Sequence, residues 1–312
     1  MSTPVVKIEN LVKRYKELVA LDHFNLEIEE GEIFGLLGPN GSGKTTTINC
    51  LLSLLSYDKG NIEVFGKKMN PDSYDLKRQI GVVMQNVAVV DELTVYENID
   101  YFCGLYVKDK ALRKQYVEEA IAFVGLDDFR KFFPKKLSGG LLRRLNIACG
   151  IAHKPKLIIM DEPTTALTKK EVSALFKIIL KLKEQGIAIL FISHKLDEVF
   201  EISDRFTIFR DGELVATGST KELDDKKFTY YMTGREFSDN IFVPKNVSDK
   251  PVFELKHLTL NGSFSDINLS LRRGEILGIT GLLDSGRTEL GLSMFGLKPA
   301  DSGQIIKDGK EI

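Results

Sequence analysis

The chain has 312 residues, of which 43% are hydrophobic and 28% are charged, and its formal net charge is −1. This length permits a large α/β core with part of a second unit, while the near-zero charge gives no reason to expect nucleic acid as a partner. No apolar run approaches the roughly 20 residues that span a bilayer. The N-terminus has no signal-peptide pattern, and three widely separated cysteines are typical of a reducing cytoplasm.

The N-terminal part of the chain predicts strands followed by a phosphate-binding loop. Short apolar segments in residues 5–35, which include Tyr15, indicate an antiparallel β region. The pattern G-x-x-x-x-G-K-[ST] then wraps backbone N–H groups around a polyphosphate, and Lys44 reaches the β- and γ-phosphates. The helix that follows directs its positive end at the same anion, and Thr45 offers a hydroxyl to Mg²⁺. The predicted nucleotide ligands of this loop are Gly38, Pro39, Asn40, Gly41, Ser42, Gly43, Lys44, Thr45 and Thr46.

A polar amide and a helical region come next. Gln85 follows the apolar run at residues 80–84, and its amide could ligate Mg²⁺ or the attacking water. From about residue 86 to 155 the apolar spacing is helical, with amphipathic helices predicted over 94–106 and 114–124. Leu137-Ser138-Gly139-Gly140 begins 93 residues after Lys44. We expect Arg143 and Arg144 to lie on the surface of the helix that follows.

Two apolar runs predict central strands that end in chemically active groups. Residues 157–160 are all apolar and precede Asp161 and Glu162, and residues 187–192 precede Ser193 and His194. Such runs suit strands that are buried on both faces of a parallel sheet, whose carboxyl ends bind ligands. Asp161 could hold Mg²⁺, and Glu162 could polarise a water that attacks the γ-phosphate. A helix with apolar residues at helical spacing is predicted over 170–185.

The sequence pattern of the first part of the chain is repeated after a predicted linker at residues 236–251. Six residues reappear 243 positions later, namely Gly38, Gly43, Thr45, Asp58, Gly60 and Gly66 as Gly281, Gly286, Thr288, Asp301, Gly303 and Gly309. Arg287 replaces the lysine, and Asp284 stands where Gly41 lies in the first copy. A carboxylate in a phosphate nest repels the ligand, and a planar guanidinium does not replace an ammonium. We therefore expect no hydrolysis in this second copy.

These motifs, taken in order, resemble those of the ATP-binding cassette (ABC) ATPases over roughly residues 5–235. The resemblance implies that Tyr15 stacks on adenine and that Gln85 senses the γ-phosphate. Ser138, Gly139 and Gly140 would form the signature, which in this family binds the γ-phosphate of a nucleotide held by a partner cassette. Asp161 and Glu162 would be the metal-binding and catalytic carboxylates. His194 would be the switch histidine.

The resemblance also implies a fold and a function. We expect an α/β P-loop NTPase fold with a mixed, largely parallel central sheet, an antiparallel β subdomain and a helical subdomain. The expected domains are a complete cassette at 1–235, the linker, and a truncated second cassette at 252–312. Implied cofactors are ATP and Mg²⁺; implied partners are membrane permease subunits and a second cassette. Such a subunit would hydrolyse ATP to power transport. It would be cytoplasmic and bound peripherally at the inner face of the cell membrane.

The two parts of the chain resemble different subfamilies, and the sequence leaves two alternative functions open. Residues 1–164 resemble the ATPases of drug- and antibiotic-export systems, whereas residues 161–312 resemble the tandem ATPases of simple-sugar importers. This pattern predicts a mosaic and leaves the direction of transport open between sugar import and drug-type export. One rival is a soluble tandem ABC ATPase that acts on the ribosome or DNA. The other is an inactive mosaic fragment.

Overall fold

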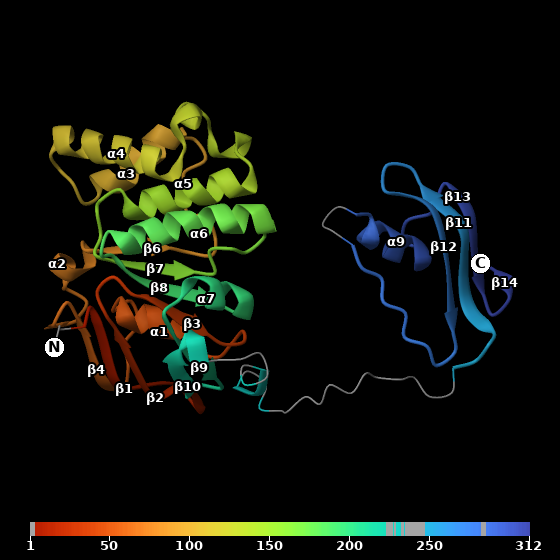
Figure 1. Cartoon of the computed structure of the whole chain (residues 1–312), viewed down its shortest axis with the longest axis horizontal. Helices are drawn as coiled ribbons and strands as arrows, with labels where there is room; N and C mark the ends of the chain where they lie inside the picture. The colour runs from red at the N-terminus through yellow and green to blue at the C-terminus, as the bar shows by residue number, and fades with distance from the viewer. Residues whose placement is uncertain (1–3, 223–226, 228, 232–233, 235–246, 282–284) are drawn as a thin grey trace. The chain divides into compact units, whose positions relative to one another are not determined.

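The structure is a computed structural model that describes residues 4–222, 227, 229–231, 234, 247–281 and 285–312. The chain divides into two compact units, Met1–Phe237 and Ser238–Ile312, here called unit 1 and unit 2 (Figure 1). Most of the predicted linker, residues 236–246, and Asp284 of the second loop lie outside the described residues.

The N-terminal part of unit 1 forms a four-stranded antiparallel sheet in the order β2-β1-β4-β5. Its strands are β1 (Val6–Tyr15), β2 (Leu18–Ile28), β4 (Lys59–Val64) and β5 (Lys67–Lys68). Buried residues alternate with exposed ones in the second half of β2, as in a sheet with one face on the core. The predicted antiparallel region at 5–35 is confirmed up to Ile28, but its last residues belong to a different sheet.

That second sheet is the centre of unit 1 and has the order β10-β9-β3-β8-β7-β6. The strands are β10 (Glu213–Ser219), β9 (Arg205–Arg210), β3 (Ile33–Leu37), β8 (Ala188–Ser193), β7 (Leu157–Asp161) and β6 (Ile80–Val83). All neighbours pair in parallel except β10 with β9. Parallel pairing brings the carboxyl ends of β3, β6, β7 and β8 to one edge, where the predicted site residues follow.

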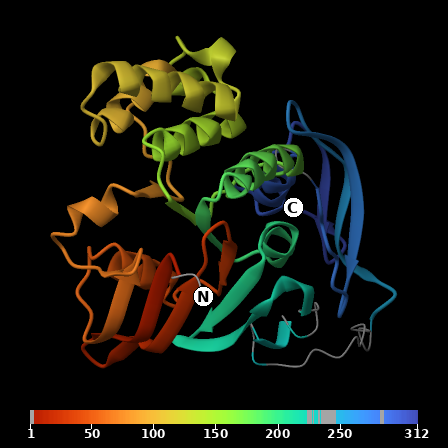
Figure 2. The same ribbon diagram turned by 60° about the vertical axis from the view of Figure 1, so that its left-hand side comes forward.

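Two hydrophobic cores cover the two faces of this sheet. In β7, Ile158 and Met160 belong to the core under the helices, while Leu157 and Ile159 belong to the core under the antiparallel sheet. Strand β8 divides in the same way, with Phe191 on the helical side. Figures 1 and 2 show α3, α4 and α5 on one side of the central sheet and the antiparallel sheet on the other. The unbroken apolar runs are therefore explained by burial on both faces.

Seven helices are described in unit 1. They are α1 (Lys44–Leu51), α2 (Tyr74–Lys77), α3 (Val95–Gly104), α4 (Lys110–Val124), α5 (Gly139–Ile151), α6 (Lys169–Glu184) and α7 (Leu196–Ile202), with short 3₁₀ turns at Asp127–Phe129, Pro134–Lys136 and Thr220–Glu222. Helix α4 begins earlier than predicted because the side chain of Asp109 caps it, accepting from Leu112 N at 2.7 Å. Among the described helices, none is long and apolar enough to cross a membrane. Residues 86–155, with α3 to α5, are called the arm below.

Unit 2 repeats the strand order of the antiparallel sheet. Its elements are β11 (Pro251–Leu260), β12 (Phe264–Arg272), α9 (Arg287–Met294), β13 (Ser302–Lys307) and β14 (Lys310–Glu311), and the sheet order is β12-β11-β13-β14. An asparagine side chain ties each hairpin, accepting from Asn10 N in unit 1 and from His257 N in unit 2 at 2.9 Å. These bonds span 15 residues in unit 1 and 11 in unit 2, so the second hairpin is shorter. The shortening removes the part of the hairpin that carries Tyr15.

Residues 276–280 of unit 2 show why its core is small. Their counterpart in unit 1 is β3, which pairs with β8 and β9. In unit 2 this segment is not a strand, and Ile276 is 74% exposed. Among the described residues of unit 2, the buried core cluster consists of Leu255, Leu258 and Leu290. The described residues therefore show an apolar segment without the flanking strands that bury it in unit 1.

Unit 1 should be thermally stable without unit 2. Its two cores consist of unit 1 residues alone. A chain ending at Asp239 is therefore expected to unfold cooperatively within about 3 °C of the main transition of the full chain, measured by calorimetry. The shorter chain should also be more soluble, since it lacks the exposed residues 276–280. A fall of about 10 °C would show that unit 2 stabilises unit 1.

Candidate nucleotide-binding site

A cavity of about 570 Å³ opens at the carboxyl ends of the central strands. Its lining residues are Tyr15, Leu18, Val19, Ala20, Asn40, Gly41, Gly43, Lys44, Thr45, Thr46, Gln85, Asp161, Glu162, Asp211 and Gly212. The cavity thus gathers the phosphate loop, the predicted stacking tyrosine, the amide and both carboxylates. These residues come from the hairpin, the phosphate loop with α1, the segments at the ends of β6 and β7, and the turn between β9 and β10.

The phosphate loop is shaped as an anion cradle. Gly43 caps α1 with a φ of 111°, and a Cβ there would lie 2.6 Å from the Ala20 carbonyl oxygen, so the position requires glycine. The first N–H groups of α1 have no acceptor within the helix. The Ser42 hydroxyl is buried and makes no hydrogen bond within the described part of the chain. A polyphosphate fits these donors because it supplies the acceptors that the loop lacks.

Lys44 is 7% exposed and holds the loop in shape. Its Nζ donates to the carbonyl oxygens of Gly38 at 2.7 Å and Pro39 at 3.0 Å. Burial lowers the pKa of this ammonium, and the charges of Glu162 and Asp161 act against that shift. Two backbone carbonyls therefore hold the Lys44 side chain at the loop.

Glu162 is the centre of a network that joins three strand ends. Gln85 Nε2 donates to its Oε2 at 3.0 Å, and His194 Nδ1 lies 3.0 Å from its Oε1. The Thr165 hydroxyl is 3.5 Å from Oε2. Glu162 has a φ of 44°, the left-handed region that residues other than glycine rarely occupy. The carboxylate is thus held at the cavity by groups that begin far apart in the sequence.

Asp161 and Thr45 are the residues that would hold a magnesium ion at this cavity. Asp161 is buried, and burial, followed by the nearby Glu162 charge, raises its pKa, while Lys44 acts in the opposite direction. Thr45 is exposed to the cavity. Among the described residues, no three His, Cys, Asp or Glu side chains cluster as a metal site. Mg²⁺ commonly takes one or two carboxylates and completes its shell with phosphates and water, so this donor set fits it.

Tyr15 lies at the mouth of the same cavity. Its ring is 45% exposed, and Lys13 Nζ lies 5.2 Å from the ring centroid. The neighbouring Leu18 is also exposed. An exposed aromatic ring beside an apolar residue offers a face on which a nucleobase could stack.

The signature residues do not line this cavity. The Ser138 side chain caps α5 by accepting from Leu141 N, and Gly140 N donates to Glu171 Oε1 at 3.0 Å. Ser138 and Gly140 line a separate cavity of about 90 Å³. Within one chain, the phosphate loop and the predicted signature are therefore not brought together. The N–H of Gly140 already has a carboxylate partner, which an incoming phosphate would have to replace.

Sequence reasoning missed two buried charged residues that support the site. Glu198 accepts from the hydroxyls of Thr164 at 2.6 Å and Ser193 at 2.9 Å, so it joins the segment after Glu162 to the segment before His194. Arg143 is 4% exposed, so the expectation that it lies on the helix surface is wrong. One signal was present, since Arg143, Ile147 and Gly150 share the helix face that packs on β6.

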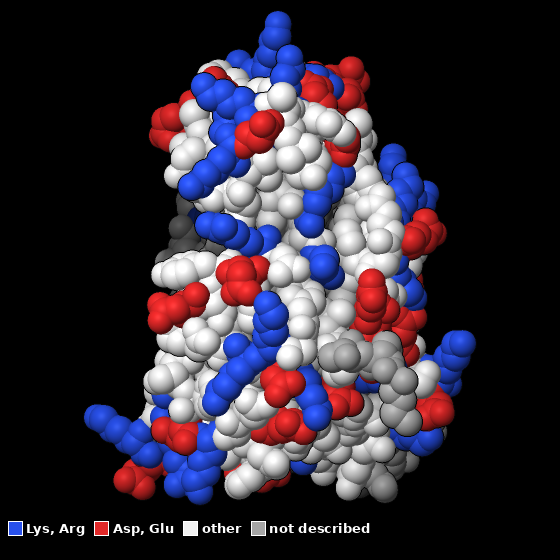
Figure 3. All heavy atoms as spheres, turned by 90° about the vertical axis from the view of Figure 1, so that its left-hand side faces the viewer, with Lys and Arg blue, Asp and Glu red and all other residues white. Residues whose placement is uncertain are grey.

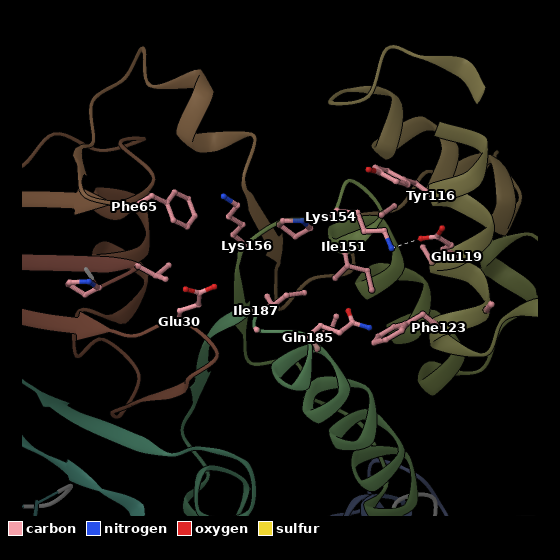
Figure 4. A pocket seen from close by; sticks show the side chains of 18 residues that line it. Glu30, Phe65, Tyr116, Glu119, Phe123, Ile151, Lys154, Lys156, Gln185 and Ile187 are labelled. Carbon is pink, nitrogen blue, oxygen red and sulfur yellow. Dashed lines mark ion pairs between the residues drawn. The ribbon is translucent and has the colours of Figure 1, made fainter. Parts of the chain in front are cut away.

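A larger cavity, of about 900 Å³, lies between the arm and the core and does not belong to the site (Figure 4). Phe65, in the turn between β4 and β5, faces Tyr116 and Phe123 of α4 across it, and Lys154 pairs with Glu119 inside it. Its walls include residues just before β7 and β8, at the amino ends of these strands. The cavity is therefore at the edge of the sheet opposite the phosphate loop.

The visible surface of unit 1 carries both signs of charge. On the face shown in Figure 3, Lys and Arg side chains are interspersed with Asp and Glu side chains. Neither sign gathers into a continuous patch on that face among the described residues. A phosphate backbone is usually bound by a basic stripe, which this face does not offer.

The sequence and the fold around this site are similar to those of known proteins. Residues 21–165 match the family model described as ABC transporter. Over these residues the sequence is that of an ABC transporter ATP-binding domain. Among solved structures, the cbiO1 protein of Clostridium perfringens, part of an ABC transporter complex, has a TM-score of 0.67 at 26% identity and covers 71% of this chain and 90% of its own. The ABC cassette MJ0796, solved as a dimer with ADP and Pi, has a TM-score of 0.63 at 28% identity and covers 70% of this chain and all of its own. The predicted ABC cassette fold is thus confirmed.

Curated relatives of the ABC domain are sugar import proteins. The galactose/methyl galactoside import ATP-binding protein MglA of Clostridium perfringens is 35% identical and aligns with 100% of this chain and 62% of its own length. The ribose import ATP-binding protein RbsA of Clostridium tetani is 34% identical and aligns with 99% of this chain and 63% of its own. The chain thus spans less than two thirds of the length of these relatives. Because they align with unit 2 as well as unit 1, the comparisons give no support to the predicted exporter-like half or to a mosaic.

The raised pKa of Asp161 predicts a cost to stability. A folded-state pKa above the unfolded value means that the ionised carboxylate disfavours folding, and this cost disappears as the pH falls through the folded pKa. Asp161→Asn should therefore raise Tm at pH 7 by about 2–4 °C, roughly 1 kcal/mol for a domain of this size. The difference in Tm between Asp161→Asn and the parent should become smaller as the pH falls toward 4. Asp128→Asn, at an exposed position, removes the same charge and should leave Tm within about 1 °C. A lower Tm for Asp161→Asn at pH 7 would contradict this account.

Proposed function

We propose that the chain binds and hydrolyses ATP as a subunit of an ABC transporter. The observation that carries the proposal is the Glu162 carboxylate, held by Gln85 and His194 in the cavity of the phosphate loop. A carboxylate so placed can accept a proton from a water that attacks the γ-phosphate. The donors of the loop face the same space, so binding and hydrolysis share one cavity.

Each residue of the site has a role in this proposal. Tyr15 stacks on the base, while the loop from Gly38 to Thr46 and the Lys44 ammonium hold the phosphates. Glu162 is the general base, and His194 and Gln85 orient it and the water. Thr45, Asp161 and Gln85 would hold Mg²⁺, which when bound neutralises charge on the phosphates.

The signature residues imply that two cassettes are needed. Ser138, Gly139 and Gly140 lie outside the cavity of their own chain and begin a helix whose positive end can receive an anion. We propose that they contact the γ-phosphate held by a second cassette, in a homodimer or a heterodimer. In this arrangement the Gly140 N–H exchanges Glu171 for the phosphate of the partner.

Sugar import is the transport function we favour over drug-type export. The support is that relatives aligned over the whole chain are import proteins for galactose, methyl galactoside or ribose. The cargo would pass through separate membrane permease subunits, with this chain bound peripherally at the inner face of the membrane. We propose the domain division 1–235, 236–251 and 252–312, in which residues 252–312 belong to a second ABC unit with an altered phosphate loop and do not hydrolyse ATP.

Lys44→Ala should weaken ATP binding. The change removes the buried cation of the loop, and charge-assisted hydrogen bonds contribute about 1.5–3 kcal/mol each, so Kd should rise by about 10–150-fold. Lys44→Arg should also bind weakly, because a guanidinium does not occupy the place of an ammonium. Calorimetric titration with MgATP measures both variants, and Lys16→Ala, an exposed lysine of the hairpin, is the control. Parental affinity in Lys44→Ala would overturn the assignment.

Glu162→Gln should bind ATP normally and turn it over slowly. The amide keeps the shape of the side chain but cannot act as a base, and losing a general base costs about 10²–10⁴-fold in kcat. With MgATP the variant should accumulate as a dimer, seen by size exclusion with light scattering. Glu184→Gln, on the exposed end of α6, should behave as the parent. Near-parental turnover in Glu162→Gln would show that another group is the base.

A further inference from the structure

The Arg143 side chain uses its whole guanidinium to hold two backbone segments of the proposed site. It lies in the second turn of α5 and is almost fully buried. Its donors reach five carbonyl oxygens: Pro163 at 2.5 Å, Met84 at 2.7 Å, Gln85 at 3.1 Å, Glu162 at 2.9 Å and Asp161 at 3.5 Å. A guanidinium has five N–H donors, so one side chain ties the segment after β6 to the segment after β7.

The packing of α5 on β6 explains why this arginine points inward. A Cβ on Gly81 of β6 would lie 2.3 Å from the carbonyl oxygen of Gly150, so helix and strand meet at backbone distance. One turn away on the same helix face, Asn146 Nδ2 donates to Met84 O at 3.3 Å. Arg143 is therefore level with the end of β6, where Gln85 follows.

The two segments carry both ends of the hydrogen bond between Gln85 and Glu162. Arg143 binds the carbonyl of each of these residues, so it fixes the backbone from which each side chain extends. Glu162 also has a left-handed backbone conformation, which such a residue keeps only where its surroundings hold it. The bond from Arg143 to the Glu162 carbonyl is one of these restraints.

The same helix begins with the signature. Ser138 caps α5, and Arg143 follows about one turn later. We propose that Arg143 is a positioning residue that fixes Gln85 and Glu162 relative to the signature turn at Ser138–Gly140. This inference rests on the proposed function.

The buried charge and the five donors of Arg143 determine how well another residue can replace it. Burial lowers the pKa of Arg143 to about 10, so the guanidinium is still a cation near neutral pH. A lysine at this position would keep the charge but offers three donors from one atom, and it cannot reach two segments in the same fork geometry. Methionine would keep much of the volume and remove every donor.

Turnover and affinity of the full chain test the inference. Arg143→Met should lower kcat by about 10–100-fold, because small misplacement of catalytic groups is costly. Its Kd for MgATP should stay within about threefold of the parent, since Lys44 and the phosphate loop form without Arg143. Arg143→Lys should recover part of kcat. Arg113→Met, which removes an arginine of the arm that pairs with Asp100, should keep parental kcat.

A second readout separates this inference from the proposed ATPase activity. Hydrogen exchange of the amides at residues 84–87 and 161–165 should quicken in Arg143→Met and not in Arg113→Met, whether or not the parent hydrolyses ATP. An inactive parent would overturn the proposed function, and the exchange data would still decide the role of Arg143. Parental kcat and exchange in Arg143→Met would overturn the inference, as would faster exchange throughout unit 1 with equal losses of kcat and affinity. Should Arg143→Met fail to fold, Arg143→Lys decides: lower kcat with parental Kd supports the inference, and parental kcat overturns it.

Discussion

Parallel pairing of β7 with β6 on one side and β8 on the other is the constraint on which the site depends. The register places Val83 beside Met160 and Asp161 beside Ile192, so the residues after each strand emerge at one level. Gln85, Glu162 and His194 are 77 and 32 residues apart along the chain, yet their side chains meet at about hydrogen-bond distance. Both faces of these strands must be covered to keep that register, which explains why unit 1 has two cores and why its apolar runs are unbroken.

The site also contains buried charged side chains, whose desolvation disfavours folding. Lys44, Asp161 and Arg143 are all buried. Burial lowers the pKa of Lys44 and Arg143 and raises the pKa of Asp161, so in each case it favours the neutral form. Backbone carbonyls stabilise the two cations, while the carboxylate of Asp161 has a second carboxylate as its neighbour. On the proposed function, a bound nucleotide with Mg²⁺ would offset part of this cost and would raise the stability of the domain by linkage.

The sequence predicted the parts of the site that depend on local pattern. The phosphate loop, the strand before Asp161 and the strand before His194 each have a short signature with a physical cause, and the structure places them as expected. The sequence could not predict the contacts of Arg143 and Glu198, because Arg143 binds carbonyl oxygens up to 59 residues away and Glu198 accepts from a hydroxyl 34 residues away. The helix face that Arg143 shares with Ile147 and Gly150 indicates an inward position, but no local pattern encodes its partners. The start of α4 was missed for a smaller reason, since the cap at Asp109 lies outside the amphipathic repeat.

Unit 2 keeps several structural features of unit 1 but lacks counterparts of residues in the proposed site. It keeps the strand order, the asparagine tie of the hairpin and the glycine that caps the helix after the loop, where Gly286 has a φ of 82°. The shorter hairpin has no place for a tyrosine like Tyr15, and Arg287 stands at the position of Lys44. Because residues 276–280 lack partner strands among the described residues, no sheet edge forms there to hold a carboxylate opposite the loop. The local pattern therefore suffices for the hairpin and the helix cap, whereas the hydrolytic geometry requires β6, β7 and β8 together.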